Sequence, residues 1–386
     1  MVRPEYDPSE PPTSFYEFIT LRHDRAQSVG RDFHFTTVFP PRPFGSYQAF
    51  GGSVLAPCVQ AAFTALQQVA GGVEAAHGFV PFSFQGSFVG PSRLNVPLEI
   101  QVKTLRFTRT FATFLIIVFQ LDASETEQRS TTESARKAMV AVFDFIRPGP
   151  SFLQFGPTPR EPVKGGAWTD VERLPSYYDE IERRENDPDQ NVSAIAVVLE
   201  RLSVADWAGI LEQRLPPESL LAQSMGGIVS SLPTCQDHLP PTHKRGADWS
   251  RYTTPFTPQG IAADPFAQLA SESGSDVAVI TPASANAAAI AHLADTKLAW
   301  FAPSSAKVSM LKLELTVTLE FSLRYHTGNL RADEWMLREM KSITAGEGRS
   351  FSEARFFDRA GRLLATMTQQ CLLRQRRSGD TPKLKL

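Results

Sequence analysis

The segment at residues 311–325 alternates between apolar and polar side chains without interruption. Alternation with a period of two is typical of a β-strand with one face in a core. The run is about three times the usual strand length of roughly 5–6 residues, so it predicts a long curved strand or two strands joined at a bulge. The polar face of such a strand is where a large sheet can present catalytic groups. The expected core face is Leu311, Leu313, Leu315, Val317, Leu319, Phe321, Leu323 and Tyr325.

The chain repeats one plan twice. An apolar helix is predicted at 50–72, begun by Gly51-Gly52 and closed by Gly71-Gly72. An alanine-rich helix is predicted at 284–301, with Ser284 as its N-cap. The predicted strands of the first half are 32–39, 82–89, 98–107, 111–121 and 137–146, and those after the long strand are 334–344, 349–357 and 362–374. One long helix wrapped by an antiparallel sheet is the hotdog plan, so the expected class is α+β, a double hotdog.

The expected boundaries follow changes in composition. Residues 1–150 are predicted as the first hotdog domain and 284–376 as the second, followed by a flexible tail at 377–386. Residues 151–283 begin in a proline cluster and are interpreted as a linker or insertion that includes the first strand of the second hotdog as one option. Within it, periodicity leaves residues 191–202 open between strand and helix.

Composition excludes several classes of function. With 42% hydrophobic and 21% charged residues and a net charge of −2, nothing predicts binding to nucleic acid or an anionic membrane. No signal peptide or apolar run of about 20 residues is present. The cysteines and histidines show no zinc spacing, and no cofactor motif occurs, so we expect neither metal nor cofactor. The expected location is the cytoplasm, with the peroxisome second, since Leu384-Lys385-Leu386 only loosely matches a Ser-Lys-Leu signal.

Several motifs occur in an order that resembles a known family. They are Phe50-Gly51-Gly52 before the first helix, the strand pair at 102–120, the segment 318–326, Glu334-Trp335, and the last strand at 361–374. Their order and spacing resemble the type II acyl-CoA thioesterases, double-hotdog proteins that hydrolyse fatty acyl-CoA. The resemblance covers roughly residues 45–150 and 284–376. The chain differs at Glu320-Phe321, where the family has Asp-His, and at Gln85, where it often has His.

The resemblance implies a catalytic set of Asp295, Thr318 and Gln369. Asp295 is the one acid in the apolar stretch 285–301, and Gln369 falls on the apolar face of the last strand, where a carboxamide needs partners. Hydrolysis of a thioester needs a positioned water, a base and donors for the developing oxyanion. The expected substrate-binding residues are Gly51, Gly52 and Gln85, with N–H groups near the two glycines polarising the carbonyl.

Two other functions stay open on the sequence alone. One is a repurposed double hotdog that catalyses dehydration, cyclisation or product release in secondary metabolism. The other is a non-catalytic acyl-binding protein. The expected partner is an acyl-CoA or acyl-carrier thioester, and the edges of hotdog sheets offer a surface for a homo-oligomer. His292 lies one turn before Asp295 and is expected to be half-exposed.

Overall fold

The computed structural model describes residues 12–43, 49–120, 136–188, 209–229, 232–272 and 278–376. The predictions for residues 191–202 and for the tail at 377–386 lie outside the described residues. Among the helices described, none is long and apolar enough to cross a bilayer.

The described strands form one twelve-stranded antiparallel sheet. Its spatial order is β1-β2-β4-β5-β6-β3-β9-β12-β11-β10-β8-β7. The bounds are β1 Leu21–His23, β2 Asp32–Thr37, β3 Val80–Phe88, β4 Glu99–Phe107, β5 Phe111–Gln120, β6 Arg136–Ile146, β7 Leu211–Arg214, β8 Gly246–Tyr252, β9 Leu313–Tyr325, β10 Met336–Gly346, β11 Arg349–Asp358 and β12 Leu363–Gln375. The alternating patterns of both halves therefore give the expected α+β double hotdog.

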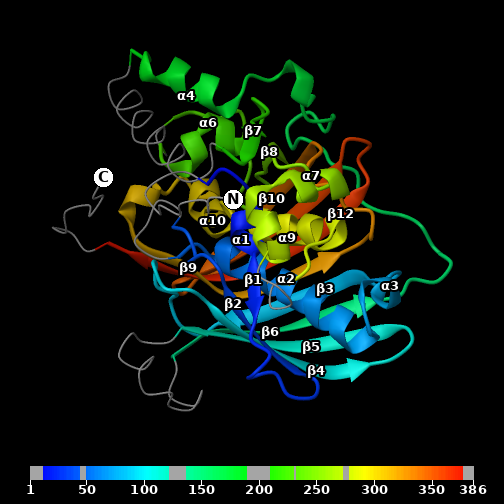
Figure 1. The fold of residues 1–386 in the computed structure, drawn as a ribbon. Helices are drawn as coiled ribbons and strands as arrows, with labels where there is room; N and C mark the ends of the chain where they lie inside the picture. The colour runs from blue at the N-terminus through cyan, green and yellow to red at the C-terminus, as the bar shows by residue number, and fades with distance from the viewer. Residues whose placement is uncertain are drawn as a thin grey trace.

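Two long helices lie together in the core between the two halves of the sheet (Figure 1). They are α2 Gly51–Ala70 and α9 Pro282–Ala294. The other α-helices of the described residues are α1 Tyr16–Ile19, α3 Val73–Ala76, α4 Tyr177–Glu185, α6 Leu220–Gln223, α7 Pro258–Ala263, α8 Pro265–Glu272 and α10 Leu298–Ser305. In Figure 1 the first-half strands, blue to cyan, lie below these two helices, and the orange and red strands lie above the first-half sheet.

The two halves are joined through β3 and β9, which pair from Ser83↔Arg324 to Ser87↔Glu320. The edges that two separate hotdogs would pair are thus paired within this one chain. On the far side of the second half, β8 pairs with β10, and β7 pairs with β8. Both strands come from the region between the two repeats, so this region contributes to the second half of the sheet.

Helix α2 matches its prediction closely. Its side chains from Gly52 to Gln67 are buried, as the nearly continuous apolar pattern requires. The helix ends where Gly71 takes a left-handed conformation with φ 91°, and Gly72 N–H donates to the Gln67 carbonyl at 2.8 Å. Glycine adopts this conformation without the steric cost that a side chain adds.

The prediction of one helix at 284–301 is wrong in its start and in its continuity. The N-cap is Thr281, and Ser284 is its capping-box partner inside the first turn. The helix ends at Asp295, and α10 begins only after Lys297, whose φ of 63° is left-handed. Composition could not show the break, because the residues on both sides are equally apolar. Asp295 therefore lies at a junction between two helices.

Strand β9 contains a bulge, as one of the two predictions for it required. Gln370 pairs with Glu320 and Cys371 pairs with Thr318, so Leu319 has no partner across β12. The bulge changes which positions face the helices. Phe321 and the odd positions after it are buried, whereas Leu319 is 39% exposed. The prediction of one continuous apolar face is wrong, because an inserted residue reverses the alternation and lets Thr318 face inward.

Candidate active site

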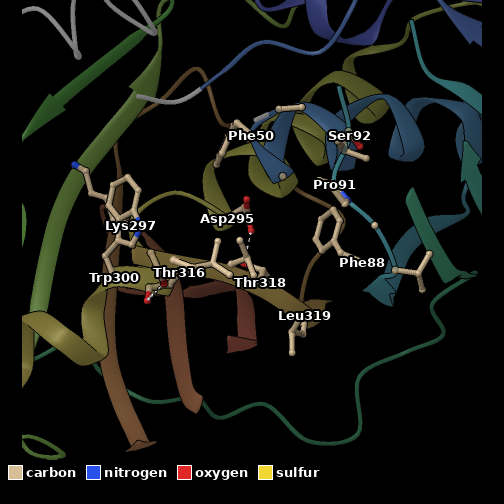
Figure 2. A pocket seen from close by; sticks show the side chains of 18 residues that line it. Phe50, Phe88, Pro91, Ser92, Asp295, Lys297, Trp300, Thr316, Thr318 and Leu319 are labelled. Carbon is tan, nitrogen blue, oxygen red and sulfur yellow. Dashed lines mark hydrogen bonds between the residues drawn. The ribbon is translucent and has the colours of Figure 1, made fainter. Parts of the chain in front are cut away.

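The candidate site is a cavity of about 420 Å³ between the start of α2, the α9–α10 junction and the first part of β9. Figure 2 shows Asp295 between the aromatic rings of Phe50 and Phe88 and the strand that carries Thr318. Most of the lining is apolar, with Asp295 and Lys297 as the charged residues of the described lining. The lining comprises Ala49, Phe50, Gly51, Val54, Phe88, Val89, Gly90, Pro91, Ser92, Asp295, Lys297, Ala299, Trp300, Leu315, Thr316, Val317, Thr318 and Leu319.

Asp295 is 8% exposed and receives hydrogen bonds from three elements. Its Oδ1 accepts from Gln369 Nε2 on β12 at 2.5 Å and from Thr318 Oγ1 on β9 at 3.4 Å. The backbone N–H of Gly52 on α2 also donates to its carboxylate. Burial raises the pKa of Asp295 to about 6, and the three donors limit this rise. A carboxyl group with this pKa is suited to exchange protons near neutral pH.

Two helix ends meet at this carboxylate. Asp295 is the C-cap of α9, where the partial negative charge of the helix end disfavours an anion. The first turn of α2 lies against it and offers N–H groups and partial positive charge. A Cβ on Gly51 would lie within 3.0 Å of the carboxylate, and one on Gly52 would overlap the His292 carbonyl. The Gly51-Gly52 pair is therefore required for the two helices to approach so closely.

Replacing Gly51 by alanine is expected to lower kcat by about 10- to 100-fold, since the new methyl must displace the Asp295 carboxylate. Thiol release from an acyl-CoA would measure the change. Gly149→Ala is the control, because a Cβ there meets nothing within 4 Å. Equal kcat values for Gly51→Ala and wild type would show that this contact does not position the carboxylate.

Gln369 is fully buried among apolar neighbours on β12. Its Nε2 donates to Asp295, while its Oε1 is buried with no hydrogen-bond partner among the residues that the structure describes. A buried acceptor without a partner is costly, which makes Oε1 a candidate acceptor for a water or substrate group. The carboxamide thus holds the carboxylate through Nε2 and leaves Oε1 as an acceptor directly behind the cavity, whose lining does not include Gln369 itself.

The structure brings together five of the six predicted site residues. Asp295, Thr318 and Gln369 are in direct contact, and Gly51 and Gly52 lie against Asp295. Gly52 differs from its expected use, because its N–H is directed to the carboxylate. Gly51 lines the cavity and remains the candidate donor to a substrate carbonyl.

The expectation for Gln85 does not fit its position. Gln85 is exposed on β3 and does not line the cavity. Along β3, Phe84 is fully buried and Phe88 lines the cavity, so the alternation turns Gln85 to the outer face. The alternation of apolar residues around Phe84 and Phe88 indicates which face of the strand Gln85 occupies, whereas the position of Gln85 in the family motif does not.

His292 is also placed differently from its expectation. It is fully buried, and its Nδ1 lies 2.8 Å from the Tyr252 hydroxyl. Its ring is 5.3 Å from that of Phe50, and burial lowers its pKa to about 3. It is therefore a neutral core residue behind the site. In the described part of the chain, no group of three or more His, Cys, Asp or Glu side chains could hold a metal ion.

Lys297 was not predicted as a site residue. Its side chain lines the cavity, and burial lowers its pKa to about 8. Its Nζ donates to Gln213 Oε1 at 2.9 Å and lies 3.7 Å from Asp248 Oδ2. In Figure 2 this nitrogen points away from Asp295, so the cavity meets mainly the aliphatic part of the side chain.

Both halves of the chain match known domain families. Residues 40–146 match the sequence model of the acyl-CoA thioesterase N-terminal domain, and residues 157–373 match that of the C-terminal domain.

Solved structures show the same fold at low identity. The chain is similar to acyl-CoA thioesterase II TesB2 from Mycobacterium marinum, with 17% identity, 95% and 100% of the two chains covered, and a TM-score of 0.56. It is also similar to a tesB protein of Mycobacterium avium subs paratuberculosis, with 16% identity, 90% of this chain and 94% of that chain covered, and a TM-score of 0.52. A third similar structure is a hot dog fold protein of unknown function from Alicyclobacillus acidocaldarius, with 14% identity, 94% of this chain and 98% of that chain covered, and a TM-score of 0.53. Together with the two domain matches, this fold shows that the chain belongs to the acyl-CoA thioesterase family and is a thioester hydrolase.

Proposed function

We propose that this chain hydrolyses acyl thioesters of coenzyme A or of an acyl carrier, using a water held by Asp295, Thr318 and Gln369. The observation that carries the proposal is the buried Asp295 carboxylate at the end of an apolar cavity, hydrogen-bonded to the other two side chains. The mostly apolar lining suits an acyl chain, since its burial is favourable.

The reaction follows from the proton acceptors present. The Asp295 carboxylate takes a proton from the water while the water oxygen attacks the thioester carbonyl carbon. Gln369 Oε1 accepts the second hydrogen of the water and so fixes its orientation. When the C–S bond breaks, protonated Asp295 returns the proton to the thiolate, which leaves as a thiol. The products are a carboxylic acid and the free thiol of the carrier.

The developing oxyanion needs a donor directed at the carbonyl oxygen. Gly51 N–H is the candidate, because Gly51 is the first residue of α2 and lines the cavity. The partial positive charge at the N-terminus of α2 favours the negative oxygen there.

The differences from the family motif lie outside the cavity. Glu320 is exposed, and Phe321 is buried with its ring 5.0 Å from that of Phe84. Neither residue is among those lining the cavity. These differences therefore supply no observation in favour of dehydration or cyclisation over hydrolysis.

Purified protein is expected to release free thiol from acyl-CoA or acyl-carrier substrates, with an acid limb in kcat near pH 6. Only the ionised carboxylate accepts a proton, and its pKa is raised to about 6, so kcat falls about tenfold per pH unit below this value. Thiol release from substrates of different chain length, followed as a function of pH and corrected for enzyme-free hydrolysis, measures both the activity and its acid limb. Absence of thiol release from every CoA and carrier substrate would refute the proposal.

A further inference from the structure

The junction between α9 and α10 exposes backbone carbonyls inside the protein. The carbonyls of Leu293 and Thr296 flank Asp295 on either side in the chain. Lys297 turns the chain with φ 63°, a left-handed conformation that glycine usually supplies at a helix end. Local donors reach both carbonyls, Thr296 N–H to Leu293 O at 3.1 Å and Leu298 N–H to Thr296 O at 2.8 Å. A side chain from another element binds the same two carbonyls.

That side chain is Arg338 on β10. Its side chain is fully buried, on the face of β10 that packs towards the helices with Met336 and Met340. Its Nη1 donates to Leu293 O at 2.7 Å, to Thr296 O at 2.8 Å and to Thr296 Oγ1. One guanidinium nitrogen thus binds the backbone on both sides of Asp295.

Asp248 on β8 fixes the other side of the guanidinium. Its Oδ1 accepts from Arg338 Nε at 3.2 Å and its Oδ2 from Nη2 at 2.6 Å, with both side chains fully buried. This paired geometry orients the planar group, which lysine cannot reproduce. Lys297 Nζ lies 3.7 Å from the same carboxylate, so the junction itself is also linked to Asp248.

The charge of Arg338 has a second effect at this place. The C-terminus of α9 carries partial negative charge and ends in the Asp295 carboxylate. A guanidinium hydrogen-bonded to the last carbonyls of that helix offsets this partial negative charge.

We infer that Arg338, oriented by Asp248, is a positioning residue that fixes the α9–α10 junction so that the Asp295 carboxylate meets its donors and the cavity. The inference rests on the proposed function, because it assigns a purpose to the position of the base. Catalytic groups need placement to about 0.5 Å, and a displacement of about 1 Å can cost about 10²-fold in rate.

The test is a double-mutant cycle on thiol release. Arg338→Lys keeps the charge but loses the fork that joins Asp248 to both carbonyls. It is expected to lower kcat by about 10- to 100-fold with KM within about threefold of wild type. In an Asp295→Asn background, the same change is expected to leave the residual rate unaltered, since it acts only through the base.

Arg214→Lys is the matched control. Arg214 also donates to two backbone carbonyls, of Val171 and Leu174, and to a carboxylate, of Glu212, in the same half of the sheet. It is expected to leave kcat within about twofold of wild type. If Arg338→Lys does not fold, Asp248→Asn takes its place in the cycle, because the guanidinium then keeps the carbonyls while the carboxylate that orients it, and that also lies near Lys297, loses its charge.

The outcomes separate the two proposals. An Asp295→Asn enzyme with wild-type kcat would refute the role of the base. A large loss in Asp295→Asn, combined with an Arg338→Lys effect that is absent or equally large in both backgrounds, would overturn the positioning role alone.

Discussion

Replacing Asp295 by asparagine is expected to lower kcat by about 10²- to 10⁴-fold, the usual contribution of a positioned general base. Asparagine keeps the shape of the side chain and can still accept from Gln369 and Thr318, but it cannot take a proton from water. The effect should therefore fall on kcat, while KM for an acyl-CoA changes little. Single-turnover thiol release with excess enzyme measures the residual rate.

Asp144→Asn is the matched control for this substitution. Asp144 also accepts from two hydroxyls, of Ser83 at 3.0 Å and of Thr113 at 2.6 Å, and it does not line the cavity. Its kcat is expected to stay within about twofold of wild type. Comparable activity of the Asp295→Asn and Asp144→Asn proteins would contradict the assignment of the base.

Asp295→Asn should also make the protein more stable at alkaline pH. The folded pKa of Asp295, about 6, is above the unfolded value of about 3.8, so the folded state holds its proton more tightly. The ionised carboxylate therefore costs stability as pH rises from 3.8 through 6, by up to about 3 kcal/mol above pH 7. Asparagine does not titrate, so the gain in the free energy of unfolding should be larger at pH 8 than at pH 4. Denaturant unfolding at the two pH values measures it, and an equal difference at both would exclude a raised pKa.

The period-two and helical patterns were sufficient to predict most strands and the helix α2. They report burial, and burial in this fold follows the side of the sheet or helix that a residue occupies. The motifs then indicated Asp295, Thr318 and Gln369, which the structure brings into contact. Residues more than 70 positions apart, such as Asp295 and Gln369, become neighbours only through the order of strands in the sheet.

The features that shape the site itself could not be predicted in this way. The bulge at Leu319 and the helix break before Lys297 depend on the register of β12 and on the contacts of Arg338. Gln85 was misplaced because a motif position does not say which face of a strand it occupies. Local sequence thus predicts helices and strands well. The bulge and the helix break that shape the site depend on residues distant in the chain.

Replacing Gln369 by methionine is expected to lower kcat by about 10²- to 10³-fold, comparable to the loss of one positioned donor in other hydrolytic sites. Methionine is similar in length and suits the apolar surroundings, so the core should stay filled. Two groups disappear at once: the Nε2 donor to Asp295, and the Oε1 acceptor that has no partner among the described residues.

The pH profile distinguishes this loss from a packing defect. The Gln369 donor lowers the pKa of Asp295, so its removal raises that pKa further and moves the acid limb of kcat above pH 6. Gln370→Met is the control, since the adjacent side chain points to the other face of β12 and is only partly buried. A glutamine that merely fills space would leave the acid limb where it is after its replacement by methionine. A lower kcat with a shifted limb requires that the carboxamide act on the carboxylate directly.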